Sequence, residues 1–503
     1  MNFIDKKLNS ITMYRVVLYG LVLLAAIAIA LGFFGVIFYS GFDLIFSLVI
    51  ITASSMASNV FFAKLYRAPR NIESVYITAF ILFFLMEPLM TLPGIVTLVA
   101  VSVVSMLSKY LFAIGKRHVF NPVAIATVLL TVVGSGAVIW WVSTPVLSLA
   151  TLVIGFLIVR KIRRFPLVIS FIVTAMVSLG FTSIAPSGQA YPPFIKELFL
   201  SWPLVFFATI MLTEPLTTPP TKSTQVTYGV LVGLLFASVF SVGPLRSTPE
   251  LALVLGNIYS YLVSSKQKLL LNLSRMTRLT PTVYDFAFTP DQRLRFRPGQ
   301  YLEWTLPHEP SDSRGNRRYF TVASSSTEKE VHLGVRIDGI GSSSFKRALL
   351  EMGQGDMMVA SHLSGEFTLP RDPARKLVFI AGGIGVTPFR SMVKYLLDNN
   401  ERRDVVLLYF ANADTDFAYS DLFEEARAKI GLAVDYIASV PTPAWKGRTG
   451  RLTPQTVAEI VPDFKERYFM LSGPNAMVEN YKKLLHSMGV ASDMIQTDYF
   501  PGF

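Results

Sequence analysis

The residues best placed to do chemistry in this sequence form a glycine-rich run, Gly382–Pro388, which reads Gly-Gly-Ile-Gly-Val-Thr-Pro. Glycines let a backbone come close to a ligand, and a helix that begins near Pro388 would offer its N-terminus to a phosphate group. Arg318, earlier in the chain, has a side chain that can bind a phosphate through two parallel hydrogen bonds. Taken singly, such a glycine run is often only a tight turn, and a lone arginine is often only a surface charge.

Two further segments accompany the glycine run in a fixed order. Arg-Tyr-Phe-Thr at Arg318–Thr321 precedes it, and Ser-Gly-Pro at Ser472–Pro474 follows it. Together the three segments resemble the ferredoxin–NADP reductase family, which passes hydride from a nicotinamide to a flavin. The resemblance implies FAD and NAD(P)H as cofactors and an NAD(P)H-dependent flavin oxidoreductase as the activity.

The resemblance assigns a role to each residue of the flavin site. Arg318 would pair with the flavin pyrophosphate, the Phe320 ring would pack on the isoalloxazine, and Thr321 would hydrogen-bond near flavin N5. Gly341 and Ser344 match the Gly-x-x-Ser turn that follows, whose amides and hydroxyl suit phosphate oxygens.

The nicotinamide site follows in the same way. Ser472 stands where many relatives have a cysteine beside the carbon that transfers hydride, and the tail Asp498–Phe503 is similar to an acid-x-Phe-x-Gly-aromatic tail. Thr321, Ser472 and Asp498 are the expected catalytic residues, although Asp498 replaces the more usual Glu. The residues expected to bind FAD or NAD(P)H are Arg318, Tyr319, Phe320, Thr321, Gly341, Ser344, Gly382, Gly383, Gly385, Thr387, Pro388, Gly473, Pro474, Phe500 and Phe503.

The loop over residues 411–416, Ala-Asn-Ala-Asp-Thr-Asp, bears on the choice of nucleotide. It has acidic residues and lacks an arginine or lysine that could meet a 2′-phosphate. This pattern favours NADH over NADPH, because a carboxylate can accept hydrogen bonds from ribose hydroxyls.

The elements that must position these residues change character along the chain. Alternating, strand-like segments at 282–288, 300–306, 319–324 and 331–337 predict a small antiparallel barrel. After Arg375 the rhythm becomes strand, glycine turn, helix, with strands at 377–380 and 405–410 and helices at 388–398 and 417–429. That alternation predicts a parallel sheet. We therefore expect a flavin-binding β-barrel over 266–370 and a nucleotide-binding α/β domain over 371–503.

The preceding residues, 1–265, are typical of a membrane domain. The whole chain is 52% hydrophobic and has a mean hydropathy of +0.47. Apolar runs predict about ten transmembrane helices, near residues 12–39, 43–63, 74–90, 94–115, 121–141, 143–159, 165–184, 194–212, 226–242 and 248–264. Lysines and arginines gather in the loops after the even-numbered runs. By the positive-inside rule both termini are cytoplasmic, in a prokaryotic inner membrane.

Composition excludes several classes of protein. The chain has no cysteine, so it can hold neither disulfides nor thiolate-bound iron–sulfur clusters or zinc. It has five histidines, of which only His118 lies in the membrane domain, so paired-histidine haems are excluded there. The net charge of +12 belongs largely to loops that orient membrane helices, and no basic helix indicates nucleic-acid binding. No metal site is expected.

Two polar stretches of the membrane domain carry a second resemblance. Phe120-Asn121-Pro122 opens the fifth run, and residues 213–219, Thr-Glu-Pro-Leu-Thr-Thr-Pro, follow the eighth. They resemble the D subunit of the Rnf complex and the B subunit of the sodium-pumping NADH:quinone reductase. The resemblance makes Lys109, Asn121 and Thr217 candidates for binding a membrane flavin. Each has a plain alternative: Asn121 caps a helix, Thr217 belongs to a turn, and Lys109 reaches the headgroups.

The flavin of those relatives is FMN esterified to a threonine. The matching loop here, Gly134–Ala137, has no threonine in register, so a second flavin, FMN or riboflavin, would be non-covalent. The chain as a whole is expected to pass electrons from cytoplasmic NAD(P)H via FAD into the membrane domain, and across it to a flavin, a quinone or an extracytoplasmic flavoprotein. The alternatives are a membrane-anchored quinone or flavin reductase, a redox-linked ion pump, and a flavin or ion carrier.

Overall fold

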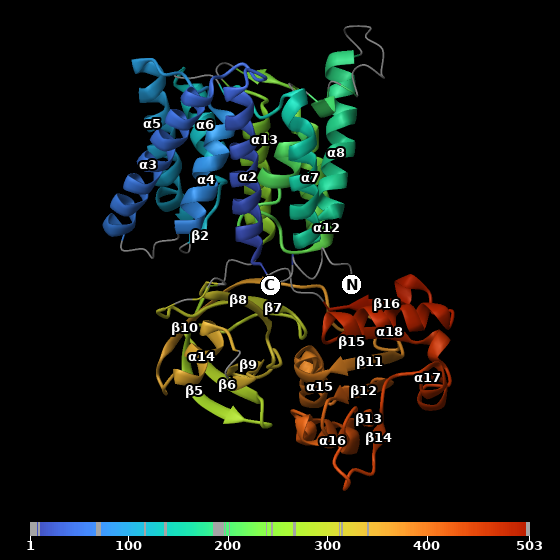
Figure 1. Ribbon diagram of the computed structural model, residues 1–503. Helices are drawn as coiled ribbons and strands as arrows, with labels where there is room; N and C mark the ends of the chain where they lie inside the picture. The colour runs from blue at the N-terminus through green and yellow to red at the C-terminus, as the bar shows by residue number, and fades with distance from the viewer. Residues whose placement is uncertain are drawn as a thin grey trace. The chain divides into compact units, whose positions relative to one another are not determined.

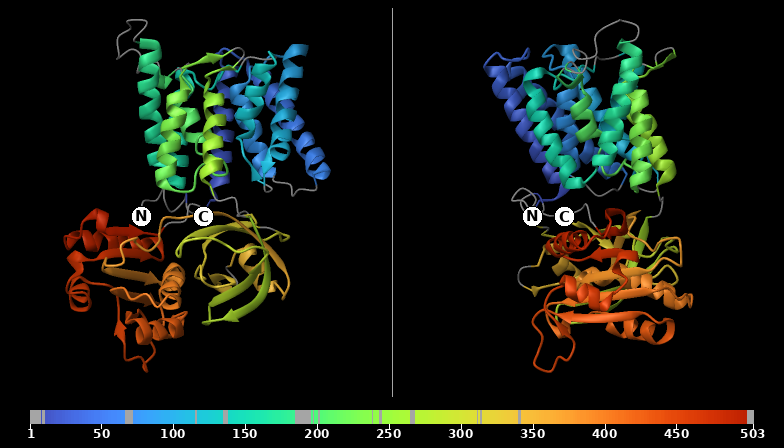
Figure 2. Two further views of the ribbon diagram at one scale, coloured as in Figure 1. Left: turned by 180° about the vertical axis from the view of Figure 1, so that it is seen from behind. Right: turned by 90° about the vertical axis from the view of Figure 1, so that its right-hand side faces the viewer.

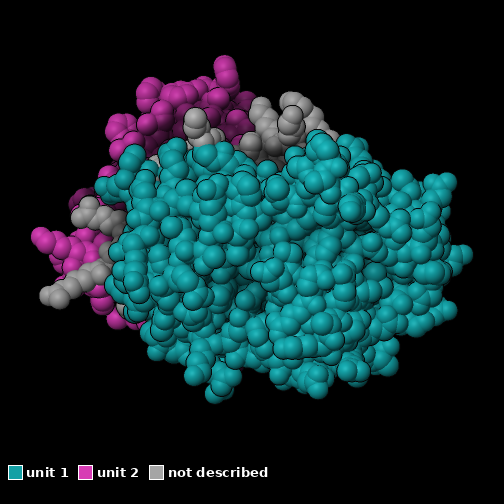
Figure 3. Space-filling view, turned by 90° about the horizontal axis from the view of Figure 1, so that it is seen from below, with its two compact units in different colours: residues 1, 267–503 teal, residues 2–266 magenta. Residues whose placement is uncertain are grey.

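The computed structural model describes residues 8, 11–66, 72–114, 117–134, 138–184, 196, 198–200, 202–237, 239–242, 245–264, 268–310, 312, 315–339 and 342–498. The chain divides into two compact units, residues 2–266 and residues 267–503, which Figure 3 colours separately. The first is the helical unit and the second is the β-rich unit.

The helical unit is a bundle of helices, with two short β-hairpins among its connections (Figure 1). One pairs β1 (Ala113–Ile114) with β2 (Arg117–His118), and the other pairs β3 (Ser241–Val242) with β4 (Leu245–Arg246). Its described helices are α2 (Met13–Phe33), α3 (Gly41–Leu65), α4 (Ile72–Leu85), α5 (Leu92–Leu111), α6 (Pro122–Val132), α7 (Pro145–Ile162), α8 (Phe165–Leu179), α11 (Leu204–Phe206), α12 (Lys222–Phe236) and α13 (Pro249–Val263). The π-helical turns η1 (Gly180–Ile184) and η2 (Phe207–Met211) extend α8 and α11. Each apolar run predicted from the sequence thus contains helix.

Five of these helices are long and apolar enough to cross a membrane: α2, α3, α5, α7 and the stretch Phe165–Thr182 that begins with α8. By contrast, α4 has 14 residues, α6 has 11, and α12 and α13 have 15 each. A straight span needs about 20. The expectation of about ten spans is therefore not confirmed, because the described residues contain five candidates.

Hydrogen bonds at the C-terminus of α4 explain why this helix is short. The backbone N–H of Ile139, which follows α6 in the chain, donates to the carbonyl of Leu85 at 3.0 Å. The indole of Trp141 donates to the carbonyl of Phe83 at 2.6 Å, and Trp141 is buried. These bonds satisfy carbonyls that a helix C-terminus leaves open. Irregular backbone of this kind is tolerated at membrane depth where protein covers it.

The first half of the β-rich unit is an antiparallel barrel. Its six strands have the order β8-β7-β10-β5-β6-β9, with β5 at Leu269–Arg278, β6 at Val283–Pro290, β7 at Tyr301–Thr305, β8 at Arg317–Thr321, β9 at Val331–Arg336 and β10 at Met357–Ser364. The backbone of Ala323, just after β8, donates to the carbonyl of His332 in β9 at 2.9 Å and so draws the two edges together. Buried Trp304, Phe286 and Phe288 lie in its core, and α14 (Ser344–Glu351) packs there through Phe345.

The second half is a parallel sheet with helices on both faces, as Figure 2 shows. The strand order is β14-β13-β12-β11-β15-β16, with β11 at Leu377–Gly382, β12 at Val405–Ala411, β13 at Ala433–Ala438, β14 at Arg448–Thr449, β15 at Tyr468–Ser472 and β16 at Ile495–Thr497. Alternate residues of β11 face two separate cores. One core is shared with α15 (Thr387–Asp398) and α16 (Ser420–Ile430), the other with α17 (Pro454–Ile460) and α18 (Asn475–Ser487).

The strand order reverses at β11, since β12 lies on one side of it and β15 on the other. In open parallel sheets, ligands bind beyond the carboxyl ends of the strands at such a reversal. Here these ends carry Gly382 and Ser472, which are two of the residues singled out in the sequence.

Candidate functional site

Two glycine-containing loops meet at the carboxyl ends of β11 and β15. A Cβ built on Gly385 would lie 2.5 Å from the Cα of Gly473, and a Cβ on Gly382 would lie 2.5 Å from the Met477 sulfur. A side chain at Gly385 would collide with backbone, so glycine is required there, whereas at Gly382 the methionine side chain would have to move. The loop residues Gly382, Gly385, Gly473 and the adjoining Pro474 are thereby brought together.

The glycine run then turns into α15. Gly383 has a φ of +53°, which glycine adopts readily, and the space beside it is open. The Thr387 hydroxyl donates to the carbonyl of Ile384 at 3.2 Å, and Pro388 occupies the first turn of the helix, where its missing N–H costs nothing. The run therefore ends at a helix N-terminus of the kind that binds phosphate groups.

Ser472 and Asp498, predicted to be catalytic, lie in contact. The Ser472 hydroxyl donates to the Asp498 carboxylate at 3.0 Å, and the Asp498 backbone N–H donates to the carbonyl of Leu471 at 2.8 Å. The register of β16 beside β15 makes this pairing, because Leu471 lies opposite Thr497. The carboxylate thus fixes the direction of the serine hydroxyl at the mouth of the two loops.

Thr321 ends β8 and is 3% exposed. Its hydroxyl has no hydrogen-bond partner among the described residues. A buried hydroxyl without a partner costs about 1–3 kcal/mol, so such groups are rare unless a ligand or water completes them. This orphaned hydroxyl fits the predicted hydrogen bond to a flavin.

Arg318 lies on the same strand and is also 3% exposed. Its guanidinium donates to the carbonyls of Gly315 and Arg317 at 3.1 and 2.6 Å, and it lies 5.2 Å above the Phe345 ring. An anion is already close to it, because an Asp312 carboxylate oxygen lies 3.8 Å from the second guanidinium nitrogen.

Asp312 also engages Ser344, at the beginning of α14. The Ser344 N–H donates to the Asp312 carboxylate at 2.9 Å, and the Ser344 hydroxyl accepts from the Asp312 N–H at 2.9 Å. The same hydroxyl lies 2.8 Å from a ring nitrogen of His308. Arg318 and Ser344, both predicted to hold phosphate oxygens, therefore share one carboxylate, and this pair of donors fits the pyrophosphate of FAD.

The two aromatic residues between Arg318 and Thr321 point in different directions. Phe320 packs toward the Phe345 ring, with the ring centres 6.0 Å apart, so it shares a face with Arg318. The Tyr319 hydroxyl instead donates to the buried Glu303 carboxylate at 2.8 Å. The structure thus places Phe320 near the arginine and separates Tyr319 from it, as strand alternation requires.

A buried polar network that the sequence reasoning missed joins the barrel to the nucleotide-binding sheet. Arg390 of α15 donates to the carbonyl of Ala323 at 3.1 Å and forms a two-pronged ion pair with Glu328. The next residue, Ser391, donates to the carbonyl of Ser324 at 2.6 Å. These bonds hold the helix that follows the glycine run against the segment that follows Thr321. No sequence signal separates Arg390 from an ordinary surface arginine.

The network continues through Asp285 of β6. Its carboxylate oxygens lie 2.7 Å from a His332 ring nitrogen and accept from the Tyr419 hydroxyl at 2.7 Å. Burial alone would raise the pKa of Asp285, but the hydrogen bonds from His332 and Tyr419 and the nearby positive charges hold this pKa below its ordinary value. The ionised form is therefore the one that the interface stabilises.

The polar motifs of the helical unit converge on Glu214. One oxygen of its carboxylate accepts from the Asn121 amide at 2.9 Å and from the Thr217 hydroxyl at 3.0 Å. The other lies 3.7 Å from a His118 ring nitrogen. The Asn121 side chain also caps α6, and its backbone N–H donates to buried Asn257 at 2.8 Å. Asn121 and Thr217 are thus brought together, and the hydrogen bonds of their side chains are made with groups of the protein.

Lys109, the third predicted flavin ligand of this unit, donates to the carbonyl and the hydroxyl of Ser74, both at 3.1 Å. It therefore holds α4 against α5. Gly341, Phe500 and Phe503 lie outside the described residues. Within the described part of the chain, no three His, Cys, Asp or Glu residues gather as a metal site would require.

Comparison with known proteins supports both resemblances. Residues 139–268 match the model of the NQR2, RnfD, RnfE family, and residues 379–483 match that of the oxidoreductase NAD-binding domain. The helical unit therefore resembles a family of membrane proteins, and the β-rich unit resembles NAD-dependent oxidoreductases.

Relatives of known activity match less than half of this chain. The glycine betaine monooxygenase reductase subunit of Pseudomonas aeruginosa (strain UCBPP-PA14) is 29% identical over 227 residues, which are 43% of this chain and 61% of that protein. NADH oxidoreductase HCR of Escherichia coli (strain K12) is 27% identical over 227 residues, 44% and 65% of the two chains. The FAD/NAD-binding domain of a nitric oxide dioxygenase from Vibrio cholerae aligns with a TM-score of 0.42 and 21% identity, over 46% of this chain and 98% of that one. The chain thus spans about three fifths of the curated relatives it matches.

Proposed function

We propose that this chain, whose parts match the NQR2, RnfD, RnfE family and an oxidoreductase NAD-binding domain, is a membrane-bound, NAD(P)H-oxidising flavoprotein. Electrons pass from cytoplasmic NAD(P)H via FAD into the membrane domain, and across it to a flavin, a quinone or an extracytoplasmic acceptor. The observation that carries the proposal is the orphaned hydroxyl of Thr321. It lies two residues before Ala323, whose carbonyl is bound by the helix that follows the glycine run.

In this proposal, Arg318 and Ser344 hold the FAD pyrophosphate, Phe320 borders the ring system, and Thr321 donates to it. When bound, FAD accepts a hydride and can release electrons one at a time. The chain's own residues provide the geometry. The two loops that meet at Gly385 and Gly473 would hold the nicotinamide, and Asp498 orients the Ser472 hydroxyl beside it.

NADH is the preferred donor in this proposal. Asp414 and Asp416 follow β12, and Asp414 accepts from the N–H and the hydroxyl of Thr442 at 2.9 and 2.8 Å. These hydrogen bonds hold the pKa of Asp414 below its ordinary value, so the loop carries a fixed negative charge. A 2′-phosphate would be repelled there. The name of the Escherichia coli relative, an NADH oxidoreductase, supports the same choice.

The membrane side of the proposal places the helical unit in a prokaryotic cytoplasmic membrane, with both ends of the chain inside. The five long apolar helices and the family match support a membrane location. The remaining expected spans would be completed by short helices such as α4 and α6. The last carbonyls of α4 are covered by the segment that follows α6. A non-covalent flavin in this unit is part of the proposal.

The test is the number of flavins bound per full-length chain after purification in detergent, measured for the wild type and for Arg318→Gln. Two non-covalent flavins in the wild type, one of which survives in Arg318→Gln, would support transfer of electrons through the membrane domain. One FAD in the wild type and none in the variant would leave a membrane-anchored reductase. Absence of flavin from both proteins after reconstitution with FAD would refute the proposal.

A further inference from the structure

A pocket lies in the β-rich unit, away from the glycine loops. Its volume is about 370 Å³, within the usual size range of small-molecule pockets. Its wall includes Tyr468, the first residue of β15, and Arg375, which lies just before β11. It therefore opens at the amino ends of these strands, whereas Gly382 and Ser472 lie at their carboxyl ends.

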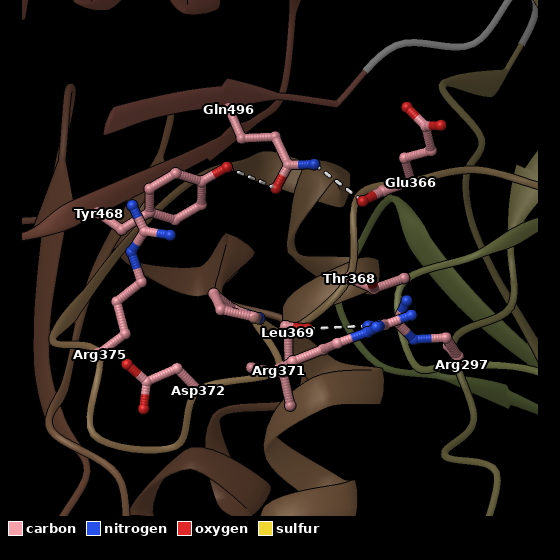
Figure 4. A pocket seen from close by; sticks show the side chains of 10 residues that line it. Arg297, Glu366, Thr368, Leu369, Arg371, Asp372, Arg375, Tyr468 and Gln496 are labelled. Atoms are coloured by element: carbon pink, nitrogen blue, oxygen red, sulfur yellow. Dashed lines mark hydrogen bonds between the residues drawn. The ribbon is translucent and has the colours of Figure 1, made fainter. Parts of the chain in front are cut away.

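Three arginines line this pocket: Arg297, Arg371 and Arg375 (Figure 4). Among the described residues, no carboxylate lies within 4 Å of any of the three guanidinium groups. Other arginines of the same unit are paired, as Arg403 is with Glu401. Like charges around one hollow repel each other, and an anion placed between them removes that repulsion.

Two of the arginines are held in place. A guanidinium nitrogen of Arg297 donates to the carbonyl of Leu369 at 3.1 Å. The Arg375 guanidinium lies 4.2 Å above the centre of the Tyr468 ring, and one of its nitrogens lies 3.2 Å from the Met494 sulfur. Figure 4 shows Arg375 and Tyr468 on one side of the pocket and the ends of Arg297 and Arg371 on the other. Such preorganised forks lose little conformational entropy when an anion binds.

Two carboxylates share the wall but do not neutralise the arginines. An Asp372 oxygen accepts from the N–H of Ala374 at 3.0 Å, and the Glu366 carboxylate is directed away from the arginines in Figure 4. Three positive and two negative side chains leave one net positive charge at the pocket.

We propose that this pocket binds a phosphate group, because guanidinium forks converging from two sides match the several acceptor oxygens of a phosphate. The phosphate belongs either to a free phosphate compound or to the headgroup of an anionic phospholipid. The pocket lies at the opposite ends of β11 and β15 from the proposed nicotinamide site, so this inference does not depend on the proposed function.

The test uses the full-length chain, saturated with FAD so that the flavin site is occupied. Hydrogen exchange is measured over residues 366–372 and 494–497 in two settings. In the first, inorganic pyrophosphate is titrated into the protein in neutral detergent. In the second, nanodiscs of phosphatidylcholine alone are compared with nanodiscs that also contain phosphatidylglycerol. The variants are Arg371→Gln, Arg375→Gln and Arg375→Lys, and the matched control is the exposed Arg402→Gln, outside the pocket.

Protection of these segments by pyrophosphate identifies a free phosphate compound, and protection in phosphatidylglycerol nanodiscs alone identifies a headgroup. In either case, each Gln variant should raise the half-saturating concentration of pyrophosphate or phosphatidylglycerol at least tenfold, Arg375→Lys should raise it less, and Arg402→Gln should leave it unchanged. The proposal is overturned if neither setting protects the segments, or if the Gln variants bind as the wild type does. If a Gln variant misfolds, the comparison of Arg375→Lys with the control decides.

Discussion

Thr321 combines a structural cost with a predicted task. Its buried hydroxyl lacks a partner among the described residues, so Thr321→Val, which keeps the shape, should raise the free energy of unfolding of the flavin-free protein by about 1 kcal/mol. The same change should slow flavin reduction by NADH about fivefold to tenfold, since one hydrogen bond to the flavin is lost. Thermal unfolding of the FAD-free chain and stopped-flow reduction measure the two effects. A valine variant that is less stable would show that protein already satisfies the hydroxyl.

Asp312 competes with the proposed cofactor for the same donors. Its carboxylate accepts from the Ser344 N–H and lies 3.8 Å from the Arg318 guanidinium. Asp312→Asn should therefore lower the dissociation constant of FAD by about tenfold, because binding no longer displaces a negative charge from the donors. Quenching of FAD fluorescence measures the constant. Asp338→Asn, at an exposed position two residues after β9, serves as the control, and weaker FAD binding by Asp312→Asn would contradict the prediction.

At the residue scale, sequence motifs singled out residues that lie close together in the structure, whereas residues outside the motifs were missed. The pairing of Ser472 with Asp498 and the convergence of Asn121 and Thr217 join residues that the sequence had already singled out. Glu214 accepts hydrogen bonds from both Asn121 and Thr217. The sequence included it in the stretch 213–219 but did not single it out as a binding residue. Arg390 was missed altogether, because its burial depends on the carbonyl of Ala323 and on Glu328, which other elements bring to it.

Among the elements, the two loops at the ends of β11 and β15 are the most tightly constrained. Gly385→Ala would place a methyl group 2.5 Å from the Gly473 Cα, so the loops must separate. We expect the rate of flavin reduction by NADH to fall at least a hundredfold, because misplaced reactants lose the benefit of fixed orientation. Gly431→Ala, at the end of α16 and away from the glycine loops, is the matched control, because it too is a glycine of positive φ. It meets no atom and should cost only about 1 kcal/mol of backbone strain. Equal effects of the two changes on the reduction rate would contradict this prediction.

The contact between the barrel and the nucleotide-binding sheet should depend on pH through Asp285. Because its pKa is lowered in the folded protein, its contribution to stability is present above its ordinary pKa of 3.8 and is lost as the pH falls through the lowered value. Asp285→Asn should reduce the free energy of unfolding by about 2 kcal/mol at pH 7, and this difference should shrink below pH 3.8. Thermal unfolding at pH 7 and pH 3 measures it. A difference that stays constant with pH would show that the charge of Asp285 does not matter.

The helices show where sequence periodicity runs out. The apolar run predicted to extend to residue 90 continues past Leu85, where α4 ends. The last carbonyls of α4 accept hydrogen bonds from the segment after α6, which is equally apolar. Hydropathy registers composition and not hydrogen-bond partners, so it merges a helix with the covered backbone that follows. The strands of the β-rich unit were easier to predict, since a parallel core and an alternating barrel leave different patterns.

For the whole molecule, the orientation of the helical unit is the property most open to direct measurement. The chain has no cysteine, so single cysteines can be introduced as labels. Lys64→Cys, at the end of α3, should react only with a membrane-impermeant maleimide that reaches the cytoplasmic face, whereas Thr91→Cys, before α5, should react only from the opposite face. In intact cells the maleimide reaches the extracytoplasmic face, and in inverted membrane vesicles it reaches the cytoplasmic face. Labelling of both cysteines from one face would contradict the positive-inside assignment.

Asn121 has a consequence for how this protein can change over evolutionary time. Its side-chain oxygen caps α6, its side-chain nitrogen donates to Glu214, and its backbone is held by Asn257. Aspartate could cap the helix but would set a second carboxylate against the first, and serine is too short to reach. Position 121 is therefore free to vary only when position 214 changes with it. Related sequences with an aspartate at 121 should therefore carry a glutamine or lysine at 214, so that substitutions in the two motifs are correlated.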